Sequence, residues 1–346
     1  MADIEFKLVE GRLGNIGLVT LNRPAALNAL NFDMIMSLLQ QLQSWQDEPD
    51  VHAVWLASSS SPAFCAGGDV VSLYKKGAQR VDEIMPFFKN EYQLKCLIRA
   101  YKKPYICFLD GITLGGGVGI SLHGSHPLAT ENFSFAMPET GIGFFPDVGG
   151  GYLLTRAIAP YGLYLALTGM RIDRDDAERA GLIKHKVAAH SNSALFEALL
   201  ASDLTVNAHE VVDEVLKDFA DDAPSARGSK LEPFLEDMSH AFSQDSVENI
   251  FDALAALDSE WSNKTLKLLH TKSPTALKVT FEQLKRCQGL SMAETMAIEY
   301  QMTNQFMQEK DFYEGVRALL VDKDNAPNWQ PKLIEDVSNN AVANYF

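Results

Sequence analysis

The chain has 346 residues, of which 47% are hydrophobic, and 30 Lys and Arg against 45 Asp and Glu give a formal net charge of −15. A chain of this length forms one large domain or two of ordinary size around a buried core, which excludes a disordered or fibrous protein. The acidic balance argues against nucleic acid as the main partner, because affinity for nucleic acid rests on Lys and Arg that neutralise phosphates.

The first half of the chain alternates predicted strands with predicted helices. Two neighbouring segments, Phe6–Val9 and Ile16–Leu21, have the pattern of a β-hairpin. Short apolar runs predict three further strands, at Val51–Ala57, Tyr105–Leu109 and Phe133–Ala136.

Two helices are predicted between these strands. Asn31 is a candidate N-cap for the first helix. The apolar face of this helix consists of Phe32, Ile35, Leu38, Leu39, Leu42 and Trp45. The second helix is predicted over Val81–Ala100, with Glu91 in a polar stripe among apolar residues.

The second half of the chain has a different character. From about residue 191 the pattern is that of long amphipathic helices without strands, interrupted by a predicted loop at Asp221–Ser229. We therefore predict an α/β core over residues 1–190 and a helical C-terminal domain over residues 191–346.

The four cysteines are widely separated and form no CxxC pair, which is typical of reduced thiols in a cytosolic protein. His123 and His126 have no third ligand nearby, so no metal site is predicted. No apolar run reaches the roughly 18–20 residues of a membrane span, and the first residues do not resemble a leader. The chain is predicted to be soluble and cytoplasmic, with no membrane partner.

Three glycine-bearing segments are candidates for chemistry. Ala66–Asp69 and Gly115–Gly117 each follow a predicted strand, and the third segment carries Glu139 and Asp147 eight positions apart. Glycines at a helix start allow close approach of a ligand and leave N–H groups unpaired. Two such loops could direct two N–H groups at one acyl oxygen as it becomes an oxyanion.

Other catalytic and nucleotide-binding motifs fail. The GxGxxG pattern breaks at Ile120 when it starts from Gly115, and at Leu122 when it starts from Gly117. The P-loop, the GxSxG nucleophile elbow and the HExxH zinc motif are absent. Cys65 lies beside the first loop, but no His–Asn arrangement supports a nucleophile there.

Taken together, these segments resemble the crotonase (enoyl-CoA hydratase/isomerase) superfamily. Its members carry an AGxD loop and a GGG loop that form an oxyanion hole for a thioester, and LNRPAALNAL at Leu21–Leu30 is similar to the segment beside the pantetheine of CoA. The resemblance implies a spiral of repeated ββα units. It also implies that Gly68 and Gly116 form the oxyanion hole. The residues that it implies contact CoA are Ala29, Ala66, Gly67 and Asp69.

Within this superfamily, hydratases resemble one another in a Glu two positions after the GGG loop, where this chain has Gly119. The segments MPET, FFPDVGGGY and EGVRALLVDKD are instead similar to the branch that hydrolyses 3-hydroxyisobutyryl-CoA. The resemblance implies hydrolysis of a short 3-hydroxyacyl-CoA, with 3-hydroxyisobutyryl-CoA of valine breakdown as the favoured substrate.

The same resemblance implies roles for three acidic residues. Glu139 would drive attack on the carbonyl carbon, either through a mixed anhydride or as general base on water. Asp147 would orient water or the 3-hydroxyl of the substrate, and Glu91 would share that task. Apolar neighbours should raise the pKa of Glu139 by desolvation, and Asp147 should add like-charge repulsion.

Two other functions stay open. One is an enoyl-CoA hydratase or isomerase that works with Glu139 alone, and the other is a non-catalytic acyl-CoA-binding protein. No metal or redox cofactor is implied, since CoA enters as part of the substrate. Crotonase relatives often form trimers or hexamers, which leaves a homo-oligomer open.

Overall fold

The computed structural model describes residues 2–59, 62–221 and 229–346. These divide into two compact units, each built from three chain segments. The first unit comprises Met1–Gly68, Gln93–Phe135 and Ile172–Ser229, and the second comprises Asp69–Tyr92, Ala136–Arg171 and Lys230–Phe346. The predicted domain boundary at residue 190 stays a prediction.

The first unit contains a six-stranded sheet with the order β1-β2-β3-β5-β7-β10. Its strands are β1 (Ile4–Val9), β2 (Asn15–Leu21), β3 (Val51–Ser58), β5 (Tyr105–Leu109), β7 (His126–Ala129) and β10 (His185–Lys186). The predicted hairpin is confirmed, because β1 and β2 pair antiparallel, whereas the later neighbours pair parallel.

A second sheet of four short strands has the order β4-β6-β8-β9. Its strands are β4 (Ala63–Cys65), β6 (Ile112–Leu114), β8 (Ser134–Ala136) and β9 (Ile172–Asp173). In chain order, β3 and β4, then β5 and β6, then β7 and β8 each contribute one strand to each sheet. This is the predicted ββα repeat, although the sequence patterns gave no signal for β4 and β6, which have only three residues each.

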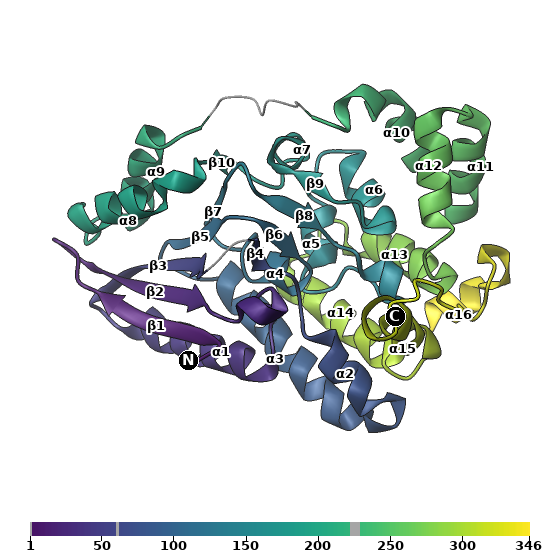
Figure 1. The fold of residues 1–346 in the computed structure, drawn as a ribbon, viewed down its shortest axis with the longest axis horizontal. Coiled ribbons are helices and arrows are strands. Elements are labelled where there is room, and N and C mark those ends of the chain that lie inside the picture. The colour runs from purple at the N-terminus through teal and green to yellow at the C-terminus, as the bar shows by residue number, and fades with distance from the viewer. Residues whose placement is uncertain (1, 60–61, 222–228) are drawn as a thin grey trace. The chain divides into compact units, whose positions relative to one another are not determined.

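Helices cover both faces of the six-stranded sheet (Figure 1). On one face, Trp45 of α1 (Phe32–Asp47) packs closely against Gly17 of β2. A Cβ on Gly17 would be only 2.6 Å from the Trp45 ring. On the other face, Ile16 and Trp55 belong to a buried cluster with leucines of α8 (Asn192–Ala201) and α9 (Ala208–Asp218). Parallel strands buried on both faces are typical of α/β proteins.

The prediction for α1 holds except at one residue. The side chain of Asn31 accepts a hydrogen bond from the Met34 N–H at 2.9 Å and caps the helix. Five of the six apolar residues are buried, but Phe32 is 43% exposed, so its assignment to the buried face was wrong. Phe32 is the first residue of the helix, next to its N-cap.

The first unit also contains α4 (Gly116–Gly119), α7 (Arg174–Arg179) and the end of α3 (Val81–Arg99). Among the described residues, no strand follows β10, as predicted for the second half of the chain. Residues 222–228 of the predicted loop lie outside the described residues.

The second unit is helical. Besides the start of α3 it contains α2 (Val70–Lys76), α5 (Gly150–Leu154), α6 (Tyr161–Thr168), α10 (Leu235–Phe242), α11 (Val247–Leu257), α12 (Glu260–Leu269), α13 (Pro274–Cys287), α14 (Met292–Phe306), α15 (Lys310–Val316) and α16 (Asn339–Ala343). Side chains cap the longest of these helices. Ser273 caps α13 ahead of a proline at the first helical position, and Ser291 forms a capping box with Glu294 on α14.

Candidate active site

The two glycine loops lie side by side in the first unit. They leave the same edge of the small sheet, because β4 and β6 are parallel neighbours with Cys65 opposite Thr113. A Cβ on Gly67 would be 3.8 Å from the Gly116 nitrogen. A Cβ on Gly117 would be 2.3 Å from the Cys65 carbonyl oxygen, so a side chain there would push the loops apart.

Gly116 opens α4, and the first N–H groups of a helix have no acceptor within the helix. Gly68 is half-buried and follows Gly67, whose φ of +114° suits glycine. These positions are compatible with the predicted oxyanion hole. That the two N–H groups bind a carbonyl oxygen stays a prediction.

The predicted CoA segment is hydrogen-bonded to the first loop. The Ala66 N–H donates to the Leu27 carbonyl at 3.0 Å, and the Leu30 N–H donates to the Gly67 carbonyl at 2.8 Å. Buried Asn28 donates its amide to two further carbonyls beside that loop. The segment that includes Ala29 is therefore held against Ala66 and Gly67.

Asp69, the fourth predicted CoA contact, caps α2 by accepting the Ser72 N–H at 3.2 Å. Cys65 is fully buried, and its thiol donates to the Asn28 carbonyl at 3.1 Å. Packing, rather than nucleophilic attack, is the role that this environment indicates for Cys65.

The predicted acidic residues gather in the second unit. Glu139 begins a 3-10 turn, Glu139–Ile142, and both Glu139 and Asp147 are 6% exposed. Glu91 of α3 is 2% exposed, so the predicted polar stripe faces the interior at this position. The structure thus buries all three predicted acids in one unit.

Close backbone packing holds the turn that carries Glu139. A Cβ on Gly143 would be 2.3 Å from the Asp311 carbonyl oxygen, and a Cβ on Gly315 would be 2.4 Å from the carbonyl carbon of Ile142. Glycine is therefore required on both sides of this contact between the turn and α15. The Phe144 N–H also donates to the Glu139 carbonyl at 3.0 Å.

Burial raises the pKa of Glu139 to about 8, and the charges of Glu299 and Glu91 contribute to the rise. Among the described residues, the Oε2 atom of Glu139 is a buried oxygen without a hydrogen-bond partner. Desolvation is the main cause of the raised pKa of Glu139, as predicted. The like-charge contribution comes from Glu299 and Glu91 rather than from Asp147.

Burial also raises the pKa of Asp147 well above its usual value. The neighbouring charges that raise this pKa further are Glu91, Glu139 and Glu299. A hydrogen bond from the Tyr92 hydroxyl to Asp147 Oδ2, 2.9 Å long, acts in the opposite direction. Glu91, Glu139, Asp147 and Glu299 form an acidic cluster. Burial and like charges favour the protonated forms of Glu139 and Asp147, while the Tyr92 hydroxyl favours ionised Asp147, so the cluster can both accept and donate a proton.

Glu299 is a member of this cluster that sequence reasoning missed. It lies on α14, is fully buried, and accepts the N–H groups of Gly149 at 2.8 Å and Gly151 at 2.9 Å. The Gln283 amide also donates to it, at 3.2 Å. Glu299 therefore holds the glycine turn that follows Asp147.

A signal for Glu299 is present in the sequence of α14. The buried residues of this helix are Met292, Thr295, Met296, Glu299, Met302, Thr303 and Phe306. An acid in phase with apolar residues on a helix indicates a buried carboxylate that needs hydrogen-bond donors.

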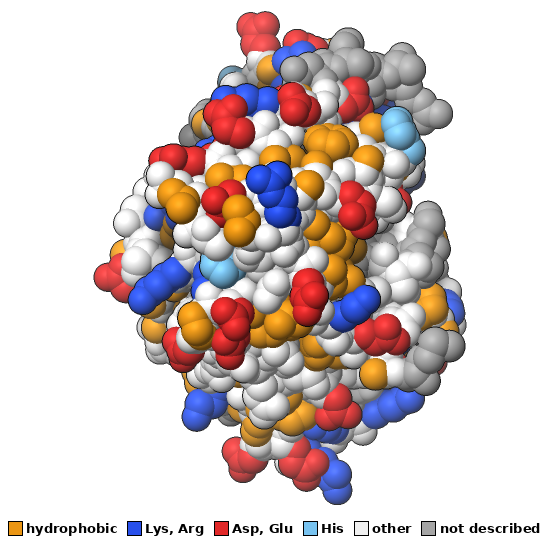
Figure 2. All heavy atoms as spheres, turned by 90° about the vertical axis from the view of Figure 1, so that its left-hand side faces the viewer, with side chains coloured by type: hydrophobic (Ala, Val, Ile, Leu, Met, Phe, Trp, Pro, Cys, Tyr) orange, Lys and Arg blue, Asp and Glu red, His pale blue; other side chains and the backbone are white. Residues whose placement is uncertain are grey.

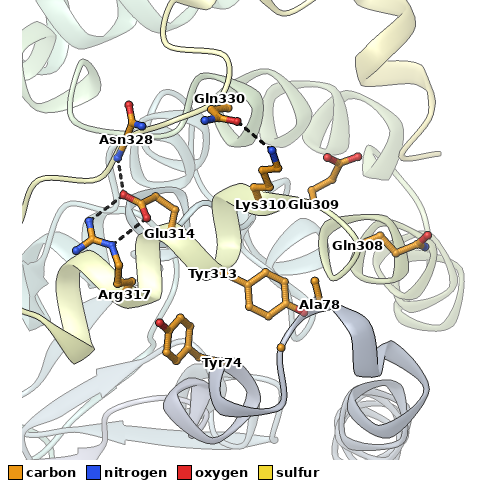
Figure 3. Close-up of a pocket in the computed structure, with 11 residues that line it drawn as sticks. Tyr74, Ala78, Gln308, Glu309, Lys310, Tyr313, Glu314, Arg317, Asn328 and Gln330 are labelled. Atoms are coloured by element: carbon orange, nitrogen blue, oxygen red, sulfur yellow. Dashed lines mark hydrogen bonds and ion pairs between the residues drawn. The ribbon is translucent and has the colours of Figure 1, made fainter.

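A pocket of about 560 Å³ lies elsewhere in the second unit (Figure 3). Tyr74 and Tyr313 line it, and Glu314 accepts hydrogen bonds from Arg317 at 2.8 Å and from the Asn328 N–H at 2.7 Å. None of the predicted site residues lines this pocket.

Among the described residues, no group of three or more His, Cys, Asp or Glu could hold a metal ion. Within the same ranges, no helix has the length and apolarity needed to span a bilayer. On the face drawn in Figure 2, Lys and Arg are scattered among Asp and Glu rather than gathered into one basic surface.

Comparison with known proteins places these features in a family. A family model described as enoyl-CoA hydratase/isomerase matches residues 16–346. The chain is 42% identical over 337 residues to the mitochondrial 3-hydroxyisobutyryl-CoA hydrolase of Xenopus tropicalis, a match that covers 97% of this chain and 87% of that protein. The human protein of the same name is 39% identical, with 96% and 86% covered.

Solved structures show the same fold. A carnitinyl-CoA dehydratase from Mycobacterium thermoresistibile has a TM-score of 0.91 at 36% identity, covering 100% of this chain and 96% of that one. An enoyl-CoA hydratase from Rhodobacter sphaeroides has a TM-score of 0.88 at 33% identity, covering 99% and 97%. The predicted crotonase fold with a helical C-terminal region is thereby confirmed.

Proposed function

Because the chain belongs to the enoyl-CoA hydratase/isomerase family, we propose that it hydrolyses 3-hydroxyisobutyryl-CoA to 3-hydroxyisobutyrate and CoA, a step of valine breakdown. The observation that carries this proposal is the similarity to curated hydrolases of that name over 97% of the chain. The buried acids of the second unit supply the chemistry that such a hydrolysis needs.

In the proposed reaction, the N–H groups of Gly68 and Gly116 bind the thioester oxygen as it becomes an oxyanion. Loss of one such donor typically costs about 100-fold to 1,000-fold in rate. Backbone donors serve this purpose well, because their positions are set by strand pairing and do not reorganise during the reaction. Ala29, Ala66, Gly67 and Asp69 contact the CoA part of the substrate.

Glu139 drives attack on the carbonyl carbon by one of two routes. As a nucleophile it displaces the CoA thiolate to form a mixed anhydride, which water then hydrolyses to release the acid and free Glu139. As a general base it takes a proton from the water that attacks the thioester, and the CoA thiolate leaves. Both routes need the ionised carboxylate, which its raised pKa makes a stronger base. The leaving thiol ionises near pH 8.5, so it departs without a dedicated proton donor.

Asp147 and Glu91 recognise the 3-hydroxyl group and orient water. Both are buried, and buried acceptors discriminate strongly against an analogue that lacks the hydroxyl. No metal or redox group takes part in this proposal.

A second candidate is hydration of an enoyl-CoA. The names of the two structural relatives favour it, since one is a dehydratase and the other a hydratase. Against it, position 119 is a glycine and offers no base, so two-carboxylate addition of water lacks one of its acids. Hydration would have to proceed with Glu139 alone.

The deciding experiment measures thiol release over a panel of saturated 3-hydroxyacyl-CoAs and enoyl-CoAs. Hydrolysis predicts free thiol from 3-hydroxyisobutyryl-CoA, with loss of activity in Glu139→Gln and Asp147→Asn. The exposed Glu236→Gln is the matched control and should keep full activity. Loss of enoyl conjugation without thiol release would support hydration, and tight binding without turnover would support a non-catalytic binding protein.

Location and assembly are separate parts of the proposal. We propose a cytoplasmic protein, whereas the curated relatives are named mitochondrial, and fractionation of the source cells would distinguish the two. A homo-oligomer is open to measurement by light scattering.

A further inference from the structure

The hydroxyl group of Tyr92 connects two segments of the acidic cluster. Its oxygen lies 2.9 Å from Asp147 Oδ2 and 2.7 Å from the hydroxyl oxygen of Thr303. Tyr92 of α3 is 4% exposed, Asp147 of the loop before α5 is 6% exposed, and Thr303 of α14 is 0% exposed. These three buried side chains therefore form one chain of hydrogen bonds.

The direction of this chain follows from counting protons. An ionised carboxylate can only accept hydrogen bonds, so the single proton of Tyr92 points at Asp147. The Tyr92 oxygen is then free to accept, and Thr303 donates to it. A protonated Asp147 would compete with Tyr92 as donor, so the arrangement favours the ionised form of Asp147.

The surroundings make this hydrogen bond unusually important for Asp147. The charged groups that act on Asp147 are Glu91 of α3, Glu139 of the 3-10 turn and Glu299 of α14, and all three oppose its ionisation. The Tyr92 hydroxyl acts in favour of ionisation. Burial and the nearby charges of Asp147 and Glu299 raise the pKa of Tyr92 itself well above its usual value, which keeps the donor protonated.

The Tyr92 ring is held in place by aromatic packing. Phe88 meets it edge to face at 6.0 Å between ring centroids, and Tyr300 does so at 6.4 Å. A ring that is fixed on two sides presents its hydroxyl at one point, so the donor costs little entropy to position.

We propose that Tyr92, supported by Thr303, is a positioning residue for the hydrolysis, whose hydroxyl holds Asp147 in one orientation and in its ionised form. This inference rests on the proposed function, in which Asp147 orients water or the substrate hydroxyl. Tyr92 acts through Asp147 and touches no reacting atom.

The test compares Tyr92→Phe and Thr303→Val with the wild type in thiol release from 3-hydroxyisobutyryl-CoA. A hydrogen bond to a charged group predicts that Tyr92→Phe lowers kcat by about 10-fold to 100-fold. The acid limb of its kcat–pH profile should move to higher pH, because Asp147 loses the donor that favours ionisation. Thr303→Val should give a smaller change in the same direction.

Tyr101→Phe is the matched control. Tyr101 is also buried, and its hydroxyl donates to the Leu42 backbone carbonyl at 3.0 Å rather than to a carboxylate. The Tyr101→Phe variant should leave both kcat and the pH profile unchanged. In an Asp147→Asn background, the loss of unfolding free energy caused by Tyr92→Phe should no longer depend on pH, because the pH-dependent part of its effect passes through the Asp147 carboxylate.

Stability provides a readout that does not depend on turnover. The destabilisation by Tyr92→Phe should grow as pH rises and Asp147 ionises, since the lost hydrogen bond serves the ionised carboxylate, whereas that of Tyr101→Phe should stay constant. An unchanged pH profile in Tyr92→Phe, with Asp147→Asn inactive, would overturn the positioning role and leave the proposed function standing. Absence of thiol release by the wild type would overturn the proposed function, and the positioning role with it.

Discussion

The glycine loops of the first unit and the acidic cluster of the second unit are assembled in different ways. The two loops lie side by side because the strands before them pair, whereas the four carboxyl groups of the cluster are buried together by the packing of side chains. The loops follow β4 and β6, which are parallel neighbours. The four acids are Glu91 of α3, Glu139 of the 3-10 turn, Asp147 of the loop before α5, and Glu299 of α14. Backbone pairing positions main-chain donors, while side-chain packing sets the protonation of the acids.

The two regions also differ in what would damage them. The second loop tolerates no added atom at Gly117, since a Cβ there would overlap the Cys65 carbonyl. The acids depend on burial and on one another's charges, because these control the pKa values of Glu139 and Asp147. Four predictions test this difference, from the largest expected effect to the smallest.

The largest effect should come from the substrate hydroxyl that the acidic cluster is proposed to recognise. Isobutyryl-CoA, which lacks that hydroxyl, should have a kcat/KM at least about 100-fold below that of 3-hydroxyisobutyryl-CoA, because buried acceptors would be left unpaired. Thiol release with both substrates measures the ratio. Glu91→Gln should reduce this ratio of kcat/KM values. Equal turnover of both substrates by the wild type would show that Glu91 and Asp147 do not recognise the hydroxyl.

The glycine loops should fail through sterics. Gly117→Ala places a Cβ 2.3 Å from the Cys65 carbonyl oxygen, and overpacking of this kind costs about 1–3 kcal/mol of unfolding free energy. Denaturant unfolding measures the loss, and thiol release should fall with it because the two loops separate.

Gly77→Ala provides the comparison for this change. A Cβ there meets nothing within 4 Å, so only the strain of its φ of +78° remains. We expect a smaller loss of unfolding free energy and unchanged thiol release. Equal losses in the two variants would show that the close approach of the loops does not matter.

Sequence reasoning identified the loops more completely than the acidic cluster, for a physical reason. Glycine runs and the residues around Glu139 and Asp147 are contiguous in the chain, so their patterns can be recognised locally. Glu299 lies 152 positions beyond Asp147, and only tertiary packing brings it to the turn at Gly149.

The errors in the fold have a similar origin. Strands β4 and β6 have three residues each, too few for a periodic pattern, and their existence depends on pairing with each other. Phe32 fits the helical spacing of its neighbours, yet the end of a helix can leave an apolar residue exposed. Spacing predicts which residues share a face, while the surrounding structure decides where that face ends.

Glu299→Gln should have a moderate effect on the acidic cluster. The amide has one acceptor oxygen, so either the Gly149 or the Gly151 N–H loses its partner, at a cost of about 1–3 kcal/mol of unfolding free energy. Removing the charge should also lower the pKa of Glu139, and the acid limb of the kcat–pH profile should move to lower pH. Glu294→Gln is the control, because Glu294 lies at an exposed cap of the same helix. An unchanged pH profile in Glu299→Gln would show that the charge of Glu299 does not raise the pKa of Glu139.

The most gradual expected effect is a loss of stability as pH rises from 4.5 to about 8. Burial raises the pKa values of Glu139 and Glu299 from 4.5 to about 8, so the folded protein binds protons that the unfolded chain has released. The contribution of these groups to stability is fully present below pH 4.5 and is lost as pH rises through about 8. Urea unfolding across this range should therefore show the unfolding free energy falling with pH, and the Glu139→Gln/Glu299→Gln double variant should flatten that slope. If the double variant kept the wild-type slope, this loss of stability would belong to other groups, and Glu139 and Glu299 would be ionised in the folded protein at neutral pH.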